Sequence, residues 1–232
     1  MAIKQTLAEL GVDDQTLSTK EQLDQDGFFV VKSVLSRKSY TNMCDEFDQI
    51  HQVEGKQSGW EVHKEDEAIR LSNVLNKTTK SGDCLYSKSL LVAAYHLLKP
   101  DFKVYDLASP SHDHQRFYND YGPAIPIGNN CVLNSLILLD PFTEDNGATW
   151  IAPGSHLLGL QPEGVMGNTL DPHSNEIRLT APAGSTVILN AHTRRGGTLN
   201  VSGEQRLRTH LTSVYAESQS NWYNRFSDAN TV

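Results

Sequence analysis

The sequence predicts a mostly β protein, a β-barrel or jelly roll wrapped by N-terminal helices. Helical patterns fill the first hundred residues, and strands separated by turns follow. Helices first and regularly spaced strands afterwards are typical of such folds. We expect one domain over residues 1–232, with a mainly helical wrap and first strands over 1–100, a barrel core over 101–216 and a C-terminal segment over 217–232.

Four segments of the first half have helical patterns. Residues 3–10 and 15–25 are charged and helical in pattern. Ser36 is a suitable N-cap for a helix reaching about Ile50, in which apolar side chains recur at helical spacing. Residues 87–98 are apolar on nearly every side, which predicts a helix packed against a sheet.

Strands are expected at residues 28–31, 103–107, 131–139 and 148–152. The run at 131–139 is largely apolar, which is typical of a central strand covered on both faces. Asp145–Gly147 is a turn signal between the last two strands.

The stretch from Ala183 to Tyr215 is expected to form a strand, a glycine-rich turn that contains Gly196 and Gly197, and a second strand from Arg206. Alternate side chains of a strand share a face. Arg206, Arg208 and His210 would then lie on one side, which indicates a site for an anion.

The composition excludes several classes of protein. The chain has 232 residues and a formal net charge of −8, which argues against a nucleic-acid partner. No window approaches the roughly 18 apolar residues of a membrane span. The three cysteines are widely spaced, so we expect no disulfide framework or zinc site. The start lacks the apolar core of a signal peptide, and we expect a cytoplasmic protein.

The run Leu139–His156, with Asn146–Ala148 and Pro153–His156 inside it, resembles the phytanoyl-CoA dioxygenase-type iron(II)/2-oxoglutarate oxygenases. The segments Asp26–Val31 and Gly184–Arg206 fit the same family, so the resemblance covers about residues 20–215. It implies a double-stranded β-helix, a jelly-roll barrel with its site inside.

The resemblance also implies an iron site of two histidines and one carboxylate, with an arginine that holds 2-oxoglutarate. Counted from Asn146 and Asn200, the three ligand positions fall at Tyr118, Asp120 and Arg195, and the arginine at Arg206, with Arg208 a poorer fit. Both histidines are therefore replaced in this degenerate member.

A guanidinium stays protonated and has no lone pair to donate to a metal. We therefore expect no metal ion and no cofactor, with Arg206 a vestige of the 2-oxoglutarate site. Arg195 and Asp120 would form an ion pair where the family holds iron(II).

Other histidines are candidates for rescue of the metal site. His112 and His114 precede Tyr118, and His114 has the correct parity but lies roughly 13 Å away along a strand. His192 is three residues before Arg195, an offset that reverses the face of a strand unless a bulge intervenes. Whether one of them binds metal stays open. His156 is expected to order its turn.

The first functional hypothesis is a pseudo-oxygenase. Such a subunit would be catalytically silent and would support an active homologous oxygenase in natural-product (secondary metabolite) biosynthesis, or pair with itself as a homodimer. Loss of ligands with retention of the scaffold motivates it.

Two alternatives keep the protein an enzyme. One is a metal-independent isomerase, dehydratase or cyclase acting on a hydrophobic small molecule, with Tyr118 as acid or base and Arg195 stabilising negative charge. The other is an active 2-oxoglutarate oxygenase with atypical iron ligands.

Overall fold

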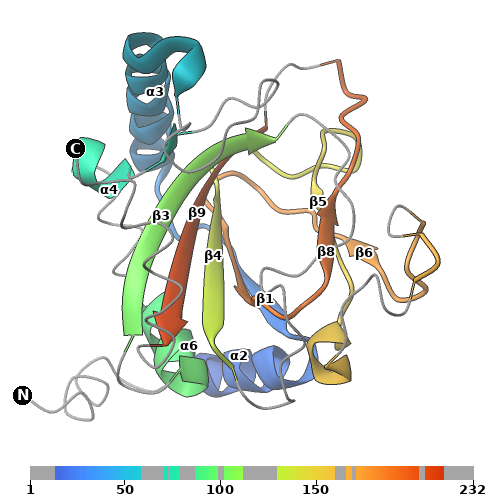
Figure 1. Cartoon of the computed structure of the whole chain (residues 1–232). Helices are drawn as coiled ribbons and strands as arrows, with labels where there is room; N and C mark the ends of the chain where they lie inside the picture. The colour runs from blue at the N-terminus through green and yellow to red at the C-terminus, as the bar shows by residue number, and fades with distance from the viewer. Residues whose placement is uncertain are drawn as a thin grey trace, which may run out of the picture.

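Two antiparallel sheets form the centre of the structure (Figure 1). The computed structural model describes residues 14–58, 71–72, 74–78, 87–98, 102–111, 130–159, 166–168, 171–203 and 207–216. The larger sheet has the strand order β1-β7-β4-β9-β3-β2, and the smaller has the order β6-β5-β8. Among the helices of the described ranges, none has the length and apolar character needed to cross a membrane.

The strands of the larger sheet are β1 (Phe28–Val31), β2 (Leu71–Ser72), β3 (Phe102–Ser111), β4 (Val132–Leu138), β7 (Thr186–Asn190) and β9 (Leu207–Ala216). Those of the smaller sheet are β5 (Thr149–Ile151), β6 (Ile177–Arg178) and β8 (Arg195–Gly197). The expected strand at 28–31 is confirmed, and β4 is buried on both faces, as expected for a central strand.

The helices are α2 (Asp14–Gln25), α3 (Arg37–Glu54), α4 (Val74–Lys77) and α6 (Lys88–Leu98), with the 3-10 turns η1 (Gly55–Gln57) and η2 (Ser155–Leu158). The Ser36 cap is confirmed, because its hydroxyl accepts from the backbone N–H of Ser39. α3 runs past the expected Ile50 and stops at Gly55, whose φ of 68° is left-handed. The helix expected over 3–10 lies outside the described residues.

The outer face of the larger sheet is covered by helices (Figure 1). Leu23 of α2 and several residues of α6 pack on Phe29, Leu133 and Ile188. α3 covers the adjoining part through a second cluster, which includes Met43, Phe47, Val74, Ile137 and Leu139. The expectation that residues 87–98 form a helix against a sheet is therefore confirmed.

A third apolar cluster joins the two sheets. Its buried members are Leu138, Phe142, Ala148, Ile151, Leu179, Ala181, Val187 and Leu189. Strand alternation separates Val187 and Leu189, which lie in this inner cluster, from Ile188, which lies under the helices. The two sheets thus pack on each other mainly through apolar side chains, with the buried Asn134, directly opposite Leu189, as a polar exception. β5 and β8 lie opposite the larger sheet.

Two local expectations were wrong. Residues 195–197 were expected in a glycine-rich turn, but they form β8, which pairs antiparallel with β5. The chain turns earlier, over 191–194. β3 is longer than the expected 103–107 because it pairs along its whole length with β9. In both cases a strand distant in sequence supplies the hydrogen bonds that local composition does not reveal.

Candidate functional site

Arg195 is the first residue of β8 and lies directly opposite Ile151 of β5. Side chains of directly paired residues lie on the same face of a sheet. Ile151 belongs to the cluster between the sheets, so Arg195 enters that space from the smaller sheet. Its side chain is only 6% exposed. The structure therefore holds a permanent positive charge on the inner, apolar side of the fold.

The opposite face of the smaller sheet is different. Trp150 lies there, flanked by its cross-strand partners Arg178 and Gly196. The Arg178 guanidinium lies 5.8 Å from the centroid of the indole ring, a cation–π contact. Arg178 is exposed, whereas Arg195 is buried. Two arginines of one sheet thus occupy contrasting environments, which makes Arg178 a control for Arg195.

Ser155 fixes the backbone just before Arg195. Its hydroxyl accepts from the Arg194 N–H at 2.8 Å and donates to the Ala152 carbonyl at 2.6 Å. The Ala152 N–H in turn donates to the Arg194 carbonyl at 3.0 Å. These three bonds join the turn after β5 to the start of β8. They set the register that places Arg195 opposite Ile151.

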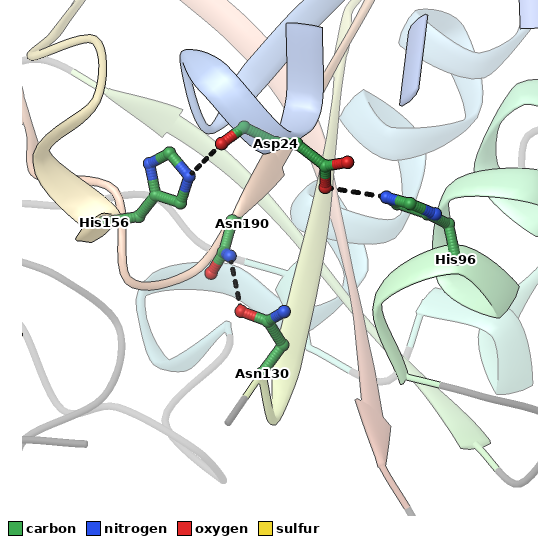
Figure 2. A network of polar contacts seen from close by, with 5 residues as sticks. All are labelled: Asp24, His96, Asn130, His156 and Asn190. Carbon is green, nitrogen blue, oxygen red and sulfur yellow. Dashed lines mark hydrogen bonds and ion pairs between the residues drawn. The ribbon is translucent and has the colours of Figure 1, made fainter. Parts of the chain in front are cut away.

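His156, in the same turn, contacts helix α2 (Figure 2). Its Nε2 donates to the backbone carbonyl of Asp24 at 3.1 Å. Burial lowers the pKa of His156, while the bond to the Asp24 carbonyl and the nearby carboxylates of Asp24 and Asp26 act in the opposite direction. The contact agrees with the expected role of His156 in ordering its turn.

Gly27 is enclosed where α2 meets the larger sheet. Its carbonyl accepts from the Asn190 N–H at 2.8 Å and from the Thr193 hydroxyl at 3.0 Å. Its φ is 81°, and a Cβ there would collide with Thr193 Oγ1 and His156 Nδ1. Glycine is required here by both conformation and space.

The Asn146–Ala148 motif also forms hydrogen bonds with the backbone of neighbouring segments. The Asn146 side chain accepts from the Thr143 N–H and donates to the Pro141 carbonyl. Asn146 forms a backbone bridge with Asn200, and the Val201 N–H donates to the Asp145 carbonyl. The motif therefore fastens the loop before β5 to the segment after β8.

Most of the other expected site residues lie outside the part of the chain that the structure describes. These are Tyr118, Asp120, Arg206, His112 and His114. Arg208 and His210 lie on β9, where the backbone of His210 pairs with that of Ile137. The described side chains include no group of three or more His, Cys, Asp or Glu residues suited to a metal ion.

His192 lies in the turn between β7 and β8 and is half-buried. The expected reversal of its direction assumed a strand through residues 192–195, and that premise was wrong. The structure also shows hydrogen bonds at Asp24 and Thr193, which the sequence did not single out, and at Gly27 and Ser155, which were named only as parts of motifs. The signal that could have found them is the pair of segments Asp26–Val31 and Pro153–His156, which meet in space.

The comparisons with known proteins agree with the fold. The model of the phytanoyl-CoA dioxygenase (PhyH) family matches residues 23–207. The multifunctional dioxygenase ausE of Penicillium brasilianum is 42% identical over 73 residues, which are 31% of this chain and 23% of that relative. The match thus spans about a quarter of the relative's length.

Two solved structures are similar over most of the chain. HygX from Streptomyces hygroscopicus, with nickel and 2-oxoglutarate bound, has a TM-score of 0.69 at 10% identity, covering 89% of this chain and 88% of HygX. The non-heme alpha ketoglutarate dependent epimerase SnoN from nogalamycin biosynthesis has a TM-score of 0.66 at 14% identity, covering 87% of this chain and 80% of SnoN. At such low identity the likeness concerns the fold.

Proposed function

Because the chain belongs to the phytanoyl-CoA dioxygenase family, we propose that it is a pseudo-oxygenase that keeps the family scaffold without its iron site. The observation that carries the proposal is the place of Arg195. It is buried, it faces the inner cluster, and it stands where the family resemblance implies a ligand histidine. A guanidinium cannot donate a lone pair and repels a cation.

The donor set does not suit iron(II). Of the three ligand positions, only Asp120 keeps a ligand of the family type, and Tyr118 and Arg195 replace the imidazoles. We propose that Arg195 and Asp120 neutralise each other in place of the metal, since a buried charge needs a partner. No cofactor takes part in this role, and Arg206 is a vestige of the 2-oxoglutarate site.

We also propose that residues 1–232 are one domain and that the two sheets close into a double-stranded β-helix. The apolar cluster shared by both sheets and the likeness to HygX and SnoN support this architecture. In a closed barrel, the Arg195 side chain would lie in the interior, where the family resemblance implies the iron site.

The proposed role is that of a partner subunit. The chain would bind an active homologous oxygenase and raise its solubility or turnover, in natural-product biosynthesis. The resemblance to a dioxygenase of Penicillium brasilianum, and to a solved epimerase from nogalamycin biosynthesis, supports this setting. Co-expression with an active homologue encoded nearby tests it: we expect a stable complex and higher turnover of the homologue. Unchanged turnover and solubility would rule the role out.

The loss of the metal site has its own test, the double variant Tyr118→His with Arg195→His. We expect the wild type to take up no stoichiometric iron(II) under anaerobic conditions and the double variant to gain binding. Arg178→His is the matched control, because it places a histidine on the outer face of the same sheet. The Arg178→His protein should gain no iron(II) binding. Binding of one equivalent by the wild type would contradict the proposal.

A second candidate is a metal-independent isomerase, dehydratase or cyclase. The positive charge of Arg195 on an apolar inner face favours it, because a preorganised charge in a dry site stabilises developing negative charge strongly. Its signature is turnover of a hydrophobic substrate in the presence of chelator, abolished by Tyr118→Phe. Turnover that survived both Tyr118→Phe and Arg195→Ala would exclude this mechanism.

A further inference from the structure

Asp24, in the last turn of α2, contacts two histidines through different atoms (Figure 2). Its carboxylate Oδ1 lies 2.7 Å from Nε2 of His96 on α6. Its backbone carbonyl accepts from Nε2 of His156 at 3.1 Å. The end of α2 is therefore tied to α6 on one side and to the Pro153–His156 turn on the other.

The bond to Asp24 fixes the tautomer of His156. A carbonyl only accepts, so Nε2 carries the hydrogen and the neutral ring leaves Nδ1 bare. Nδ1 is buried and has no hydrogen-bond partner among the described residues. It lies beside Gly27, where the space is too small even for a Cβ. The junction thus fits a neutral imidazole with a single N–H.

A protonated His156 would be poorly accommodated. The second N–H would appear at the buried Nδ1, which has no hydrogen-bond partner among the described residues, and an unsatisfied buried donor is costly. The charged or titratable groups of the segments that meet here are Asp24 and Asp26 at the end of α2, His96 of α6 through its contact with Asp24, and His192 and Arg194 in the turn before β8. The two carboxylates oppose the effect of burial, and burial is the larger effect.

The turn that His156 anchors also holds the start of β8. Gly154 N–H donates to the Asp26 carbonyl at 2.9 Å, and Ser155 Oγ accepts from Arg194 N–H at 2.8 Å. Displacement of the turn from α2 would strain both bonds. The disturbance would then reach the strand that begins with Arg195.

We propose that this junction is an acid-released clasp, in which protonation of His156 frees the Pro153–His156 turn from α2 and loosens the start of β8. The contact of the Asp24 carboxylate with His96 holds the other side of α2 on α6. The clasp is independent of the pseudo-oxygenase role and holds whether or not the protein binds iron.

Amide hydrogen exchange of the wild type tests the clasp, with the His156 ring followed by NMR in the same samples. Between about pH 7.5 and about pH 5, the protection of the Gly154 and Arg194 amides should fall with the titration midpoint of His156. The expected loss is about tenfold for each pH unit between the ordinary histidine pKa of about 6.5 and the midpoint measured for the folded protein, and it should level off below that midpoint. The amide of Ile188 in the core serves as the internal reference. Unchanged protection, or a fall with a different midpoint, would overturn the proposal.

His156→Gln provides the matched variant, because glutamine can donate to the Asp24 carbonyl but cannot be protonated. Its Gly154 and Arg194 amides should keep their protection in acid. His96→Gln is the control, and it should lose protection as the wild type does. A His156→Gln protein with the wild-type acid response would refute the clasp. If that variant does not fold, the wild type still tests the proposal, because its amide protection must be lost with the same midpoint as the His156 titration.

Discussion

At the scale of single residues, Arg195 and His156 show how burial sets chemistry. Arg195 carries its charge on the inner face of the smaller sheet, and burial against α2 lowers the pKa of His156. The identity of each residue was readable from the sequence, but its direction was not. Arg195 faces inward because β8 pairs with β5, and His156 reaches Asp24 because two segments far apart in sequence meet.

Gly27→Ala should destabilise the protein by about 3 kcal/mol or more, because the residue is left-handed and its new Cβ would collide with Thr193 and His156. Gly203→Ala is the matched control. Its φ of 79° is nearly the same, but no atom of the described residues lies within 4 Å of the added Cβ. That variant should cost only about 1 kcal/mol of backbone strain. Urea unfolding measures both, and equal losses would show that crowding at Gly27 is unimportant.

Acid should weaken the folded state through His156. The pKa of His156 is lowered on folding, so the unfolded chain binds the proton more readily. Its contribution to stability is full above the ordinary histidine pKa of about 6.5 and is lost as the pH falls from there toward the folded value. Each unit by which folding lowers the pKa of His156 corresponds to about 1.4 kcal/mol of unfolding free energy. Unfolding free energies at several pH values should fall less steeply in His156→Gln than in the wild type. Equal pH dependence of the unfolding free energy in the two proteins would contradict this prediction.

At the scale of elements, local pattern predicted the helices and several strands. β1 was predicted with its bounds because Phe28–Val31 is a β-branched and aromatic run after a glycine. The cap at Ser36 and the apolar character of residues 88–98 located α3 and α6. β8 was missed because Arg195–Gly197 has no apolar or β-branched residue, so only its pairing with β5 makes it a strand.

Ser155 is expected to stabilise the junction between β5 and β8. Ser155→Ala removes the acceptor of the buried Arg194 N–H and should lower the unfolding free energy by about 2 kcal/mol. Ser174→Ala, at an exposed position, should change it by less than about 0.5 kcal/mol. Thermal or urea unfolding compares the two variants. A Ser155→Ala protein as stable as Ser174→Ala would mean that the hydroxyl does not hold the strand.

At the scale of the whole molecule, three apolar clusters organise the fold. Two lie under the helices on the outer face of the larger sheet, and one joins the two sheets. The motifs Asn146–Ala148 and Pro153–His156 identify the family through bonds that hold backbone segments together. Because these bonds hold the scaffold and touch none of the expected ligand positions except through the backbone next to Arg195, the motifs predict the fold and not the chemistry. The chemistry depends on the residues at the ligand positions.

The central claim, that this scaffold has lost its iron site, is tested most directly by anaerobic titration of the purified wild type with iron(II), followed by an assay of 2-oxoglutarate consumption. The account predicts no stoichiometric binding and no consumption, because Arg195 cannot serve as a ligand. Binding of one equivalent of iron(II) with turnover of 2-oxoglutarate would contradict it.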